Sequence, residues 1–191
     1  LDYVVTKVAR FPFDKFSDAS NKLGTQMKAT GEVMSIGRTM EESLLKAMRS
    51  LETGVCHIYH KKFDDWTNDR LLEYIAEPTD DRLYAIAQLI RGGVDLVLIY
   101  NRTKIDMFFL EKFKNIVEFE RVVEAAPMDI EVLREAKRMG FSDKFIGQLW
   151  GVSQHDMYLL REKNGIFPVY KMIDTLSLIH ISEPTRLGMI S

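Results

Sequence analysis

Residues 28–51 (KATGEVMSIGRTMEESLLKAMRSL) constrain the fold more than any other stretch, because they encode a strand, a tight turn and a helix in direct succession. Residues 32–36 alternate polar and apolar side chains, as expected of a half-buried strand. Thr39 is the predicted N-cap of the helix, and the Glu42 carboxylate is expected to reach back to the Thr39 amide. The apolar residues of the helix share one face: Met40, Leu44, Leu45, Met48 and Leu51. This unit describes a scaffold and does not identify a reaction.

The rest of the chain is dominated by further capped amphipathic segments, which predict a mainly α-helical fold. Residues 3–8 are rich in β-formers and predict a strand, whereas 54–66 have no regular pattern. Helices are expected from about residues 68, 79 and 103 onward, and over 128–139, 142–150 and 153–163. Asn68 or Asp69 is the predicted cap of the first of these, and Thr103 that of a long helix that Pro127 ends. The composition of 94–100 (VDLVLIY) favours a strand.

Composition argues against several classes of protein. Of the 191 residues, 46% are hydrophobic and 28% charged, as in a soluble globular protein. The net charge of −2 offers no basic surplus for a nucleic-acid or membrane partner. Cys56 is the single cysteine, so no internal disulfide can form, and we expect a reducing, cytoplasmic location. No apolar run approaches the roughly 20 residues of a membrane-spanning helix. Because the first residue is not Met, we expect the true start to be missing.

Two local patterns invite a ligand-binding interpretation, and in both the plainer one is preferred. Five potential metal ligands lie close together in the sequence: Cys56, His57, His60, Asp64 and Asp65. No second cluster completes a tetrahedral zinc site, so we expect solvated loop histidines and no metal. Residues 37–39 lead into a helix N-terminus that an anion could approach, yet the lysine spacing of a phosphate-binding loop is absent. A plain strand-to-helix turn is expected there.

Residues 141–163 have the outline of a DNA-binding helix-turn-helix, with a turn at Gly151 and a second helix capped by Ser153. The acidic and basic side chains of the second helix cancel, so that helix offers no net attraction to phosphate. Two packed helices joined by glycine also occur in many helical domains. A helix-turn-helix module that binds nucleic acid is therefore the second-ranked function. The glycosylation sequon at 101–103 is interpreted as a helix cap.

Two groups of motifs, in the same order along the chain, resemble parts of one enzyme family, the large chain of carbamoyl-phosphate synthase. The first group resembles the end of its first ATP-grasp half: LDYVVTKVARFPFDKF (1–16), TQMK (25–28), GEVMSIGRT (31–39) and EESLLKAMRSLE (41–52). The second resembles its oligomerisation domain: DDRLYAIAQLIRGG (80–93), TKIDMFFLEKFKNIVEFE (103–120), GFSDKFIGQLWG (140–151) and VYKMIDT (169–175). The resemblance covers 1–175 and favours a short helix over a strand at 94–100.

The resemblance implies a fragment of a larger enzyme, with 1–52 as the end of its carboxyphosphate domain and 53–175 as its helical oligomerisation domain. The expected fold class is mainly α, with a short α/β remnant of an ATP-grasp domain in front. The whole enzyme is expected to be a ligase that makes carbamoyl phosphate from bicarbonate, glutamine-derived ammonia and two ATP, with magnesium or manganese and potassium, for arginine and pyrimidine biosynthesis. Its expected partners are a glutaminase small subunit and further copies of itself, with no nucleic acid and no membrane.

No catalytic, cofactor-binding or metal-binding residue is assigned within 1–175, because by resemblance those groups belong to other parts of the enzyme. The fragment alone is therefore expected to be inactive and to bind no cofactor. By the same resemblance, the strand at 31–34 is expected to help line the passage through which carbamate travels. Residues 176–191 resemble a translated sequencing adapter and are expected to be a non-native tail.

The long helix that begins near residue 105 carries the hypothesis about association. Its aromatic residues Phe108, Phe109 and Phe113 are expected to pack in the core. Apolar residues left outside the core are expected to mediate self-association, because exposed apolar patches on soluble domains often mark such contacts.

Overall fold

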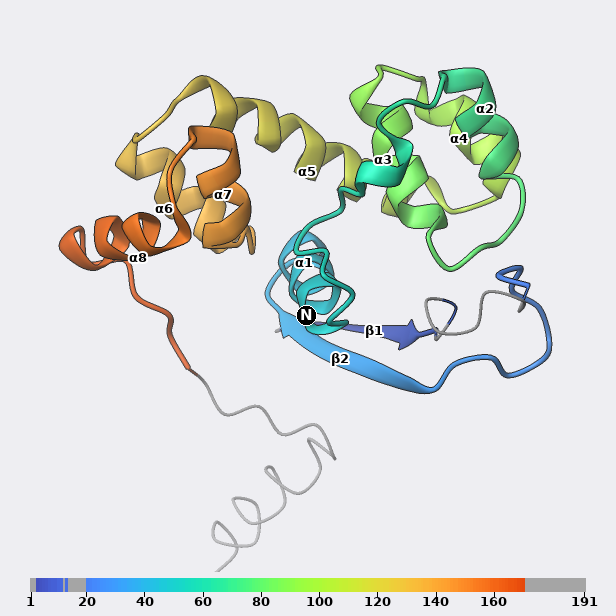
Figure 1. Cartoon of the computed structure of the whole chain (residues 1–191), viewed down its shortest axis with the longest axis horizontal. Helices are drawn as coiled ribbons and strands as arrows, with labels where there is room; N and C mark the ends of the chain where they lie inside the picture. Colours follow the sequence, from blue (N-terminus) through green and yellow to red (C-terminus); the bar gives the residue numbers. More distant parts are fainter. Residues whose placement is uncertain (1–2, 12, 14–19, 171–191) are drawn as a thin grey trace, which may run out of the picture.

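The computed structural model describes residues 3–11, 13 and 20–170, so the predicted tail at 176–191 lies outside it. In the described residues the chain forms two strands, eight α-helices and one short 3-10 helix (Figure 1). In chain order they are β1 (Val4–Arg10), β2 (Gly31–Gly37), α1 (Met40–Ser50), η1 (Lys61–Phe63), α2 (Asn68–Tyr74), α3 (Arg82–Arg91), α4 (Leu96–Thr103), α5 (Met107–Ala125), α6 (Ile130–Arg138), α7 (Asp143–Trp150) and α8 (Gln154–Lys163). The predicted mainly α fold class is confirmed.

β1 and β2 form an antiparallel two-stranded sheet in which Val4 lies opposite Gly37. Helix α1 packs against both strands and covers one face of the sheet (Figure 1). Between helix and sheet, the buried Ser43 hydroxyl donates a hydrogen bond to Thr6 Oγ1 at 2.8 Å. Because a two-stranded sheet is marginal by itself, α1 supplies the packing that holds it.

The turn between β2 and α1 differs from its prediction in one detail. Thr39 caps α1 as predicted, and its hydroxyl accepts from the Glu42 amide at 3.2 Å. The Glu42 carboxylate, however, accepts from the amide of Arg38 at 2.8 Å and not from that of Thr39. The turn is so tight that a Cβ on Gly37 would lie 2.7 Å from the Ser43 nitrogen. This close approach brings the amide that follows Gly37 within reach of the Glu42 carboxylate.

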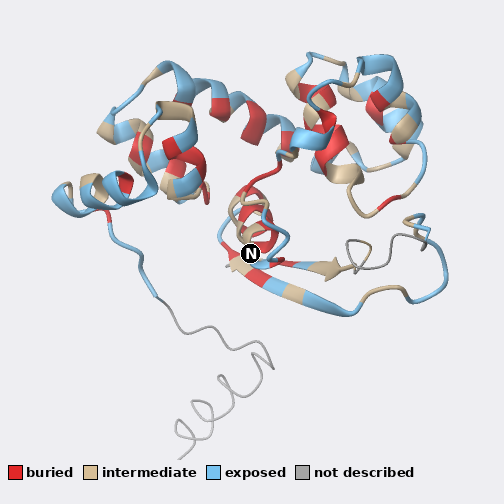
Figure 2. Ribbon diagram, viewed as in Figure 1, coloured by how far each residue is buried: buried red, intermediate tan, exposed pale blue. Residues whose placement is uncertain are grey.

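Helix α5 connects two helical lobes (Figure 1). At one end α3 and α4 pack against it, with α2 on α3, and at the other end α6 and α7 pack against it, with α8 on α7. The apolar side chains that α5 buries recur at helical spacing: Leu110, Phe113, Ile116, Val117 and Val123. Figure 2 shows buried positions along α5 and exposed ones on its other side. Both lobes therefore share a single continuous hydrophobic core.

Helix α1 belongs to the same core and is tied to the helical part at two points. Near its start, the buried Glu41 carboxylate accepts from the Asn115 side chain at 2.9 Å and pairs with Lys112 at 3.3 Å. Burial opposes ionisation of Glu41, but the contacts with Asn115 and Lys112 outweigh it and lower the pKa of Glu41. Near its end, the Arg49 guanidinium donates to the Gly140 carbonyl, just before α7. The predicted domain boundary between 52 and 53 stays a prediction, and the core extends across it.

Two helix caps lie at residues other than those predicted. Thr67 caps α2 through its hydroxyl, so the prediction of Asn68 or Asp69 is wrong. Asp106, and not Thr103, caps α5 through its carboxylate. In both cases neighbouring polar residues compete for one cap, and local sequence does not decide between them. The predicted cap Ser153 of α8 is confirmed, and Ser142 caps α7 in the same way.

Residues 96–103 form a helix, so the strand that composition favoured there is wrong and the helix that the resemblance favoured is confirmed. Asp95 caps α4 by accepting from the Val97 amide at 2.8 Å. A short apolar run has no periodicity that separates the two possibilities. Thr103 lies in the last turn of α4, where its hydroxyl donates to the Ile99 carbonyl at 2.8 Å. The sequon is therefore the end of a helix and not a cap.

Candidate functional site

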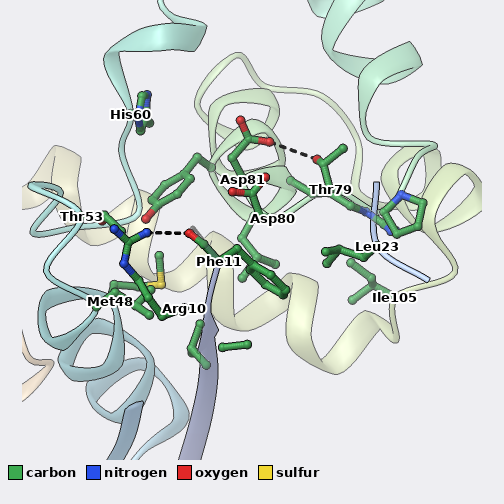
Figure 3. Close-up of a pocket in the computed structure, with 17 residues that line it drawn as sticks. Arg10, Phe11, Leu23, Met48, Thr53, His60, Thr79, Asp80, Asp81 and Ile105 are labelled. Carbon is green, nitrogen blue, oxygen red and sulfur yellow. Dashed lines mark hydrogen bonds between the residues drawn. The ribbon is translucent and has the colours of Figure 1, made fainter. Parts of the chain in front are cut away.

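A cavity of about 450 Å³ lies where the sheet meets the first helical lobe (Figure 3). The end of β1, the end of α1 and the turn that precedes α3 line this cavity. Figure 3 shows apolar side chains such as Phe11, Leu23 and Ile105 around it, and the neighbouring carboxylates of Asp80 and Asp81 facing it. Its volume falls within the range of small-molecule sites in proteins.

The two carboxylates of this cavity differ in their surroundings. Asp81 accepts hydrogen bonds from Lys62 at 2.5 Å, from the Tyr74 hydroxyl at 2.5 Å and from the Thr79 hydroxyl at 3.0 Å. Burial opposes ionisation of Asp81, but these bonds outweigh it and lower the pKa of Asp81. Burial raises the pKa of Asp80, and the charge of Asp81 raises it further. The cavity therefore offers apolar walls and one carboxyl group of raised pKa, an arrangement that can bind a ligand and assigns no reaction.

His57 is buried, so the prediction of a solvated loop histidine is wrong at this position. Its Nε2 lies 2.8 Å from Oε1 of Glu120 on α5, and its ring stacks on Phe145 of α7 at 3.7 Å between centroids. Glu120 also accepts two hydrogen bonds from Arg91 at the end of α3, at 2.7 and 2.8 Å. The cluster of His57, Arg91 and Glu120 thus joins α3, α5 and the segment after α1, beside α7.

The protonation states of this cluster follow from its burial. Burial lowers the pKa of His57, and the hydrogen bond to Glu120 opposes that effect without cancelling it. Burial also opposes ionisation of Glu120, but Arg91 and His57 outweigh it and lower the pKa of Glu120. A neutral His57 then donates from Nε2 to an ionised Glu120. Its Nδ1 finds no hydrogen-bond partner among the described residues.

The other proposed metal ligands point elsewhere. His60 accepts from the Lys62 amide at 3.1 Å and thereby caps η1, while its ring packs beside Tyr84. Asp64 accepts from the Tyr59 hydroxyl at 2.5 Å. Within the described ranges, no three His, Cys, Asp or Glu side chains are arranged to hold a metal ion together.

The helix N-terminus at 37–39 is filled by side chains of the chain itself. Thr39 and Glu42 occupy its amides, and Lys46 pairs with Glu42 at 2.5 Å. The geometry thus favours the plain strand-to-helix turn over an anion site.

The helix pair α7–α8 is formed as expected, and Gly151 between the two helices has a φ of 67°. Its charges do not suit DNA. Arg161 of α8 points inward and donates to the Asp143 carboxylate of α7 at 2.7 and 3.0 Å. Lys163 is then the Lys or Arg of α8 that remains for an outside partner, and α8 also carries two acidic residues, Asp156 and Glu162. No observation therefore favours the nucleic-acid alternative.

The aromatic residues of α5 are divided between core and surface. Phe113 is buried, as predicted, whereas Phe108 is 52% and Phe109 42% exposed, so the prediction that all three pack in the core is wrong. Phe108 lies on the side of α5 that carries Lys112, whose ammonium is 5.4 Å from the ring centroid. A second exposed apolar surface, which was not predicted from the sequence, lies on α4. The sequence feature that indicates this surface is the apolar run at 96–100, which places apolar side chains all around a short helix.

No helix in the described part of the chain is both long enough and apolar enough to cross a membrane. The sequence model of one protein family matches residues 32–165, from β2 through α8. That family is the oligomerisation domain of the carbamoyl-phosphate synthetase large chain, a ligase family. Because the match covers more than half of the residues, the chain belongs to the family of carbamoyl-phosphate synthetase large-chain oligomerisation domains.

Proposed function

We propose that this chain is the scaffold and oligomerisation region of the large subunit of a glutamine-dependent carbamoyl-phosphate synthase. The full enzyme makes carbamoyl phosphate from bicarbonate, glutamine-derived ammonia and two ATP for arginine and pyrimidine biosynthesis, in the cytoplasm. The observation that carries the proposal is the family match over 32–165. The motifs at 1–16 and 25–28, which precede that match, support a remnant of the ATP-grasp domain in front.

The packing of α1 supports a scaffold role. This helix contacts β1, β2 and α5, and Arg49 ties it to Gly140. A single rigid element therefore fixes the position of the sheet relative to both helical lobes. In the full enzyme, such an element holds the catalytic part and the association part in one orientation.

The proposed cofactors of the full enzyme are ATP, magnesium or manganese, and potassium, and we propose that none of them binds within this chain. The helix N-terminus after β2 is filled by Glu42, and the candidate metal ligand His57 is bound to Glu120. The proposed partners are the glutaminase small subunit and further copies of the large chain.

The proposal is tested with the purified chain in two assays. The first measures ADP formation from ATP with magnesium, potassium, bicarbonate and ammonia present, and we expect no bicarbonate-dependent signal. The second measures the sedimentation coefficient over a concentration series, and we expect reversible self-association. Bicarbonate-dependent ADP formation would contradict the inactive scaffold, and a chain that stays monomeric at every concentration would contradict the association role.

A further inference from the structure

We infer that the cavity between the sheet and the first helical lobe binds a small organic cation, with the Asp80 carboxylate as its counter-ion. The ligand class is an ammonium group on a short apolar body, because the cavity supplies one unpaired acid and apolar walls beside it. The inference concerns ligand binding by this chain, and it stands or falls separately from the proposed association role.

Asp80 carries a charge that no side chain of the described chain pairs with. Burial raises the pKa of its half-buried carboxyl group, the charge of Asp81 raises it further, and the backbone amides of both residues oppose that effect. No Lys, Arg or His side chain in the described ranges forms an ion pair with Asp80. A carboxylate that is partly removed from water and lacks a partner favours any cation that reaches it.

Lys62 is close enough to lower the pKa of Asp80 by its charge, but its ammonium is fixed on Asp81. It donates to the Asp81 carboxylate at 2.5 Å. It also lies 5.1, 5.8 and 5.1 Å from the centroids of three aromatic rings, those of Phe63, Trp66 and Tyr74. Cation–π contacts of this kind hold an ammonium in addition to its ion pair. Lys62 therefore satisfies Asp81 and leaves Asp80 open to a cation from outside.

The two arginines in the cavity wall have acceptors of their own. Arg10 Nη1 donates to the Phe11 carbonyl at 2.8 Å (Figure 3). Arg82 Nη2 donates to the Thr103 carbonyl at 3.0 Å. Both guanidinium groups are thus held by the backbone, whereas the acid of the cavity is unpaired. This difference favours a cationic ligand over an anionic one.

The apolar body of the ligand is accommodated by the walls around Asp80. Tyr84 is 7% exposed, and its pKa is raised mainly by burial and further by the charge of Asp80, so the two side chains lie near each other. Figure 3 shows Phe11, Leu23 and Ile105 around the same space. Small-molecule sites combine apolar and aromatic walls of this kind with a few polar groups. An aromatic face beside an ammonium adds a cation–π attraction.

The test compares two probes of nearly the same shape, phenethylammonium chloride and phenethyl alcohol, on the purified whole chain. Both bury the same apolar body, so a difference in affinity reports the charge. Amide chemical-shift changes in heteronuclear NMR locate each probe and give its Kd. We expect changes at the residues that line the cavity, and a Kd about tenfold lower for the ammonium than for the alcohol.

Asp80→Asn removes the charge with little change in size, and it should bring the two Kd values to within about twofold of each other. Asp65→Asn is the matched control, because Asp65 is an exposed acid just before α2 that does not line the cavity. This control should keep the preference for the ammonium. Circular dichroism verifies folding, and if Asp80→Asn unfolds, the two probes on the native chain decide alone. Equal affinities of the native chain for the two probes, changes confined to residues outside the cavity, or a preference that survives Asp80→Asn would each overturn the inference.

Discussion

Replacing Glu120 with alanine is expected to destabilise the chain far more than the same change at Glu118, two residues earlier on α5. Glu120 is 8% exposed and holds two partners, the fully buried His57 and Arg91, whose side chain is 19% exposed. Within the part of the chain that the structure describes, Glu118 forms one ion pair, with Lys114 at 3.5 Å, and its side chain is 56% exposed. Both changes exchange glutamate for alanine inside one helix, so helix propensity affects them alike.

The expected magnitude follows from what each substitution leaves behind. Removing one partner of a buried ion pair costs about 3–5 kcal/mol, because the other charge stays buried without compensation. Water still reaches part of Arg91, so we expect the lower end, about 3 kcal/mol, for Glu120→Ala. At about 2–4 °C per kcal/mol for a chain of this size, the thermal midpoint should fall by about 6–12 °C. Glu118→Ala should cost less than about 0.5 kcal/mol, as is usual for exposed pairs.

Urea unfolding followed by circular dichroism at pH 8 measures the free energy of unfolding of each variant. Glu120→Gln adds an intermediate case, since it keeps the side-chain volume and one acceptor oxygen but removes the charge. The expected order of destabilisation is Glu120→Ala, then Glu120→Gln, then Glu118→Ala. If Glu120→Ala costs less than about 1 kcal/mol, the cluster with His57 and Arg91 does not hold the lobes together, and the reasoning is refuted.

Two further predictions concern the pH dependence of stability and the substitution of Gly140, whose carbonyl accepts a hydrogen bond from Arg49. Because burial lowers the pKa of His57 below its ordinary 6.5, the unfolded chain binds a proton that the folded one resists, so stability should be constant well above pH 6.5 and fall below it. Urea midpoints between pH 5.5 and 8 should show this slope, and His57→Phe should reduce it. Gly140→Ala should cost about 1–3 kcal/mol, since Gly140 has a φ of 93° and its Cβ would lie 3.1 Å from the Glu42 Cα. Gly165→Ala, at a φ of 65° with no atom within 4 Å of its Cβ, should cost less in the same thermal assay.

The helices and several of their caps could be predicted because both depend on short stretches of sequence. Ser142 and Ser153 each precede an apolar-periodic segment and accept from the third amide of the helix that follows. The cap of α5 was misplaced by three residues because Thr103 and Asp106 both satisfy the local rule. The structure assigns Thr103 to the end of α4 and leaves Asp106 for α5. Where two caps compete, the length of the preceding helix decides, and that length depends on packing.

The cluster around His57 could not be predicted in the same way, because His57 and Glu120 are 63 positions apart in the chain. One signal was nevertheless present. Glu120 falls on the stripe of α5 that also carries Ile116, Val117 and Val123, so helical spacing alone places a carboxylate among buried side chains. A buried carboxylate needs a charged or hydrogen-bonding partner. The spacing therefore predicts that Glu120 has a partner, and only the fold identifies the partners as Arg91 and His57.

The exposed apolar surfaces around Phe108 and on α4, both in the first lobe, have different causes. Phe108 lies about one turn before Lys112 on the side of α5 on which Lys112 and Asn115 meet Glu41, and it stays exposed beside that contact. That surface is an extension of an intramolecular contact. Among the described elements, α4 packs mainly on α5, and Ile99 fills its inner side while Val97 and Leu98 stay exposed. The outer side of α4 is therefore exposed for a reason that does not involve α1 or the sheet.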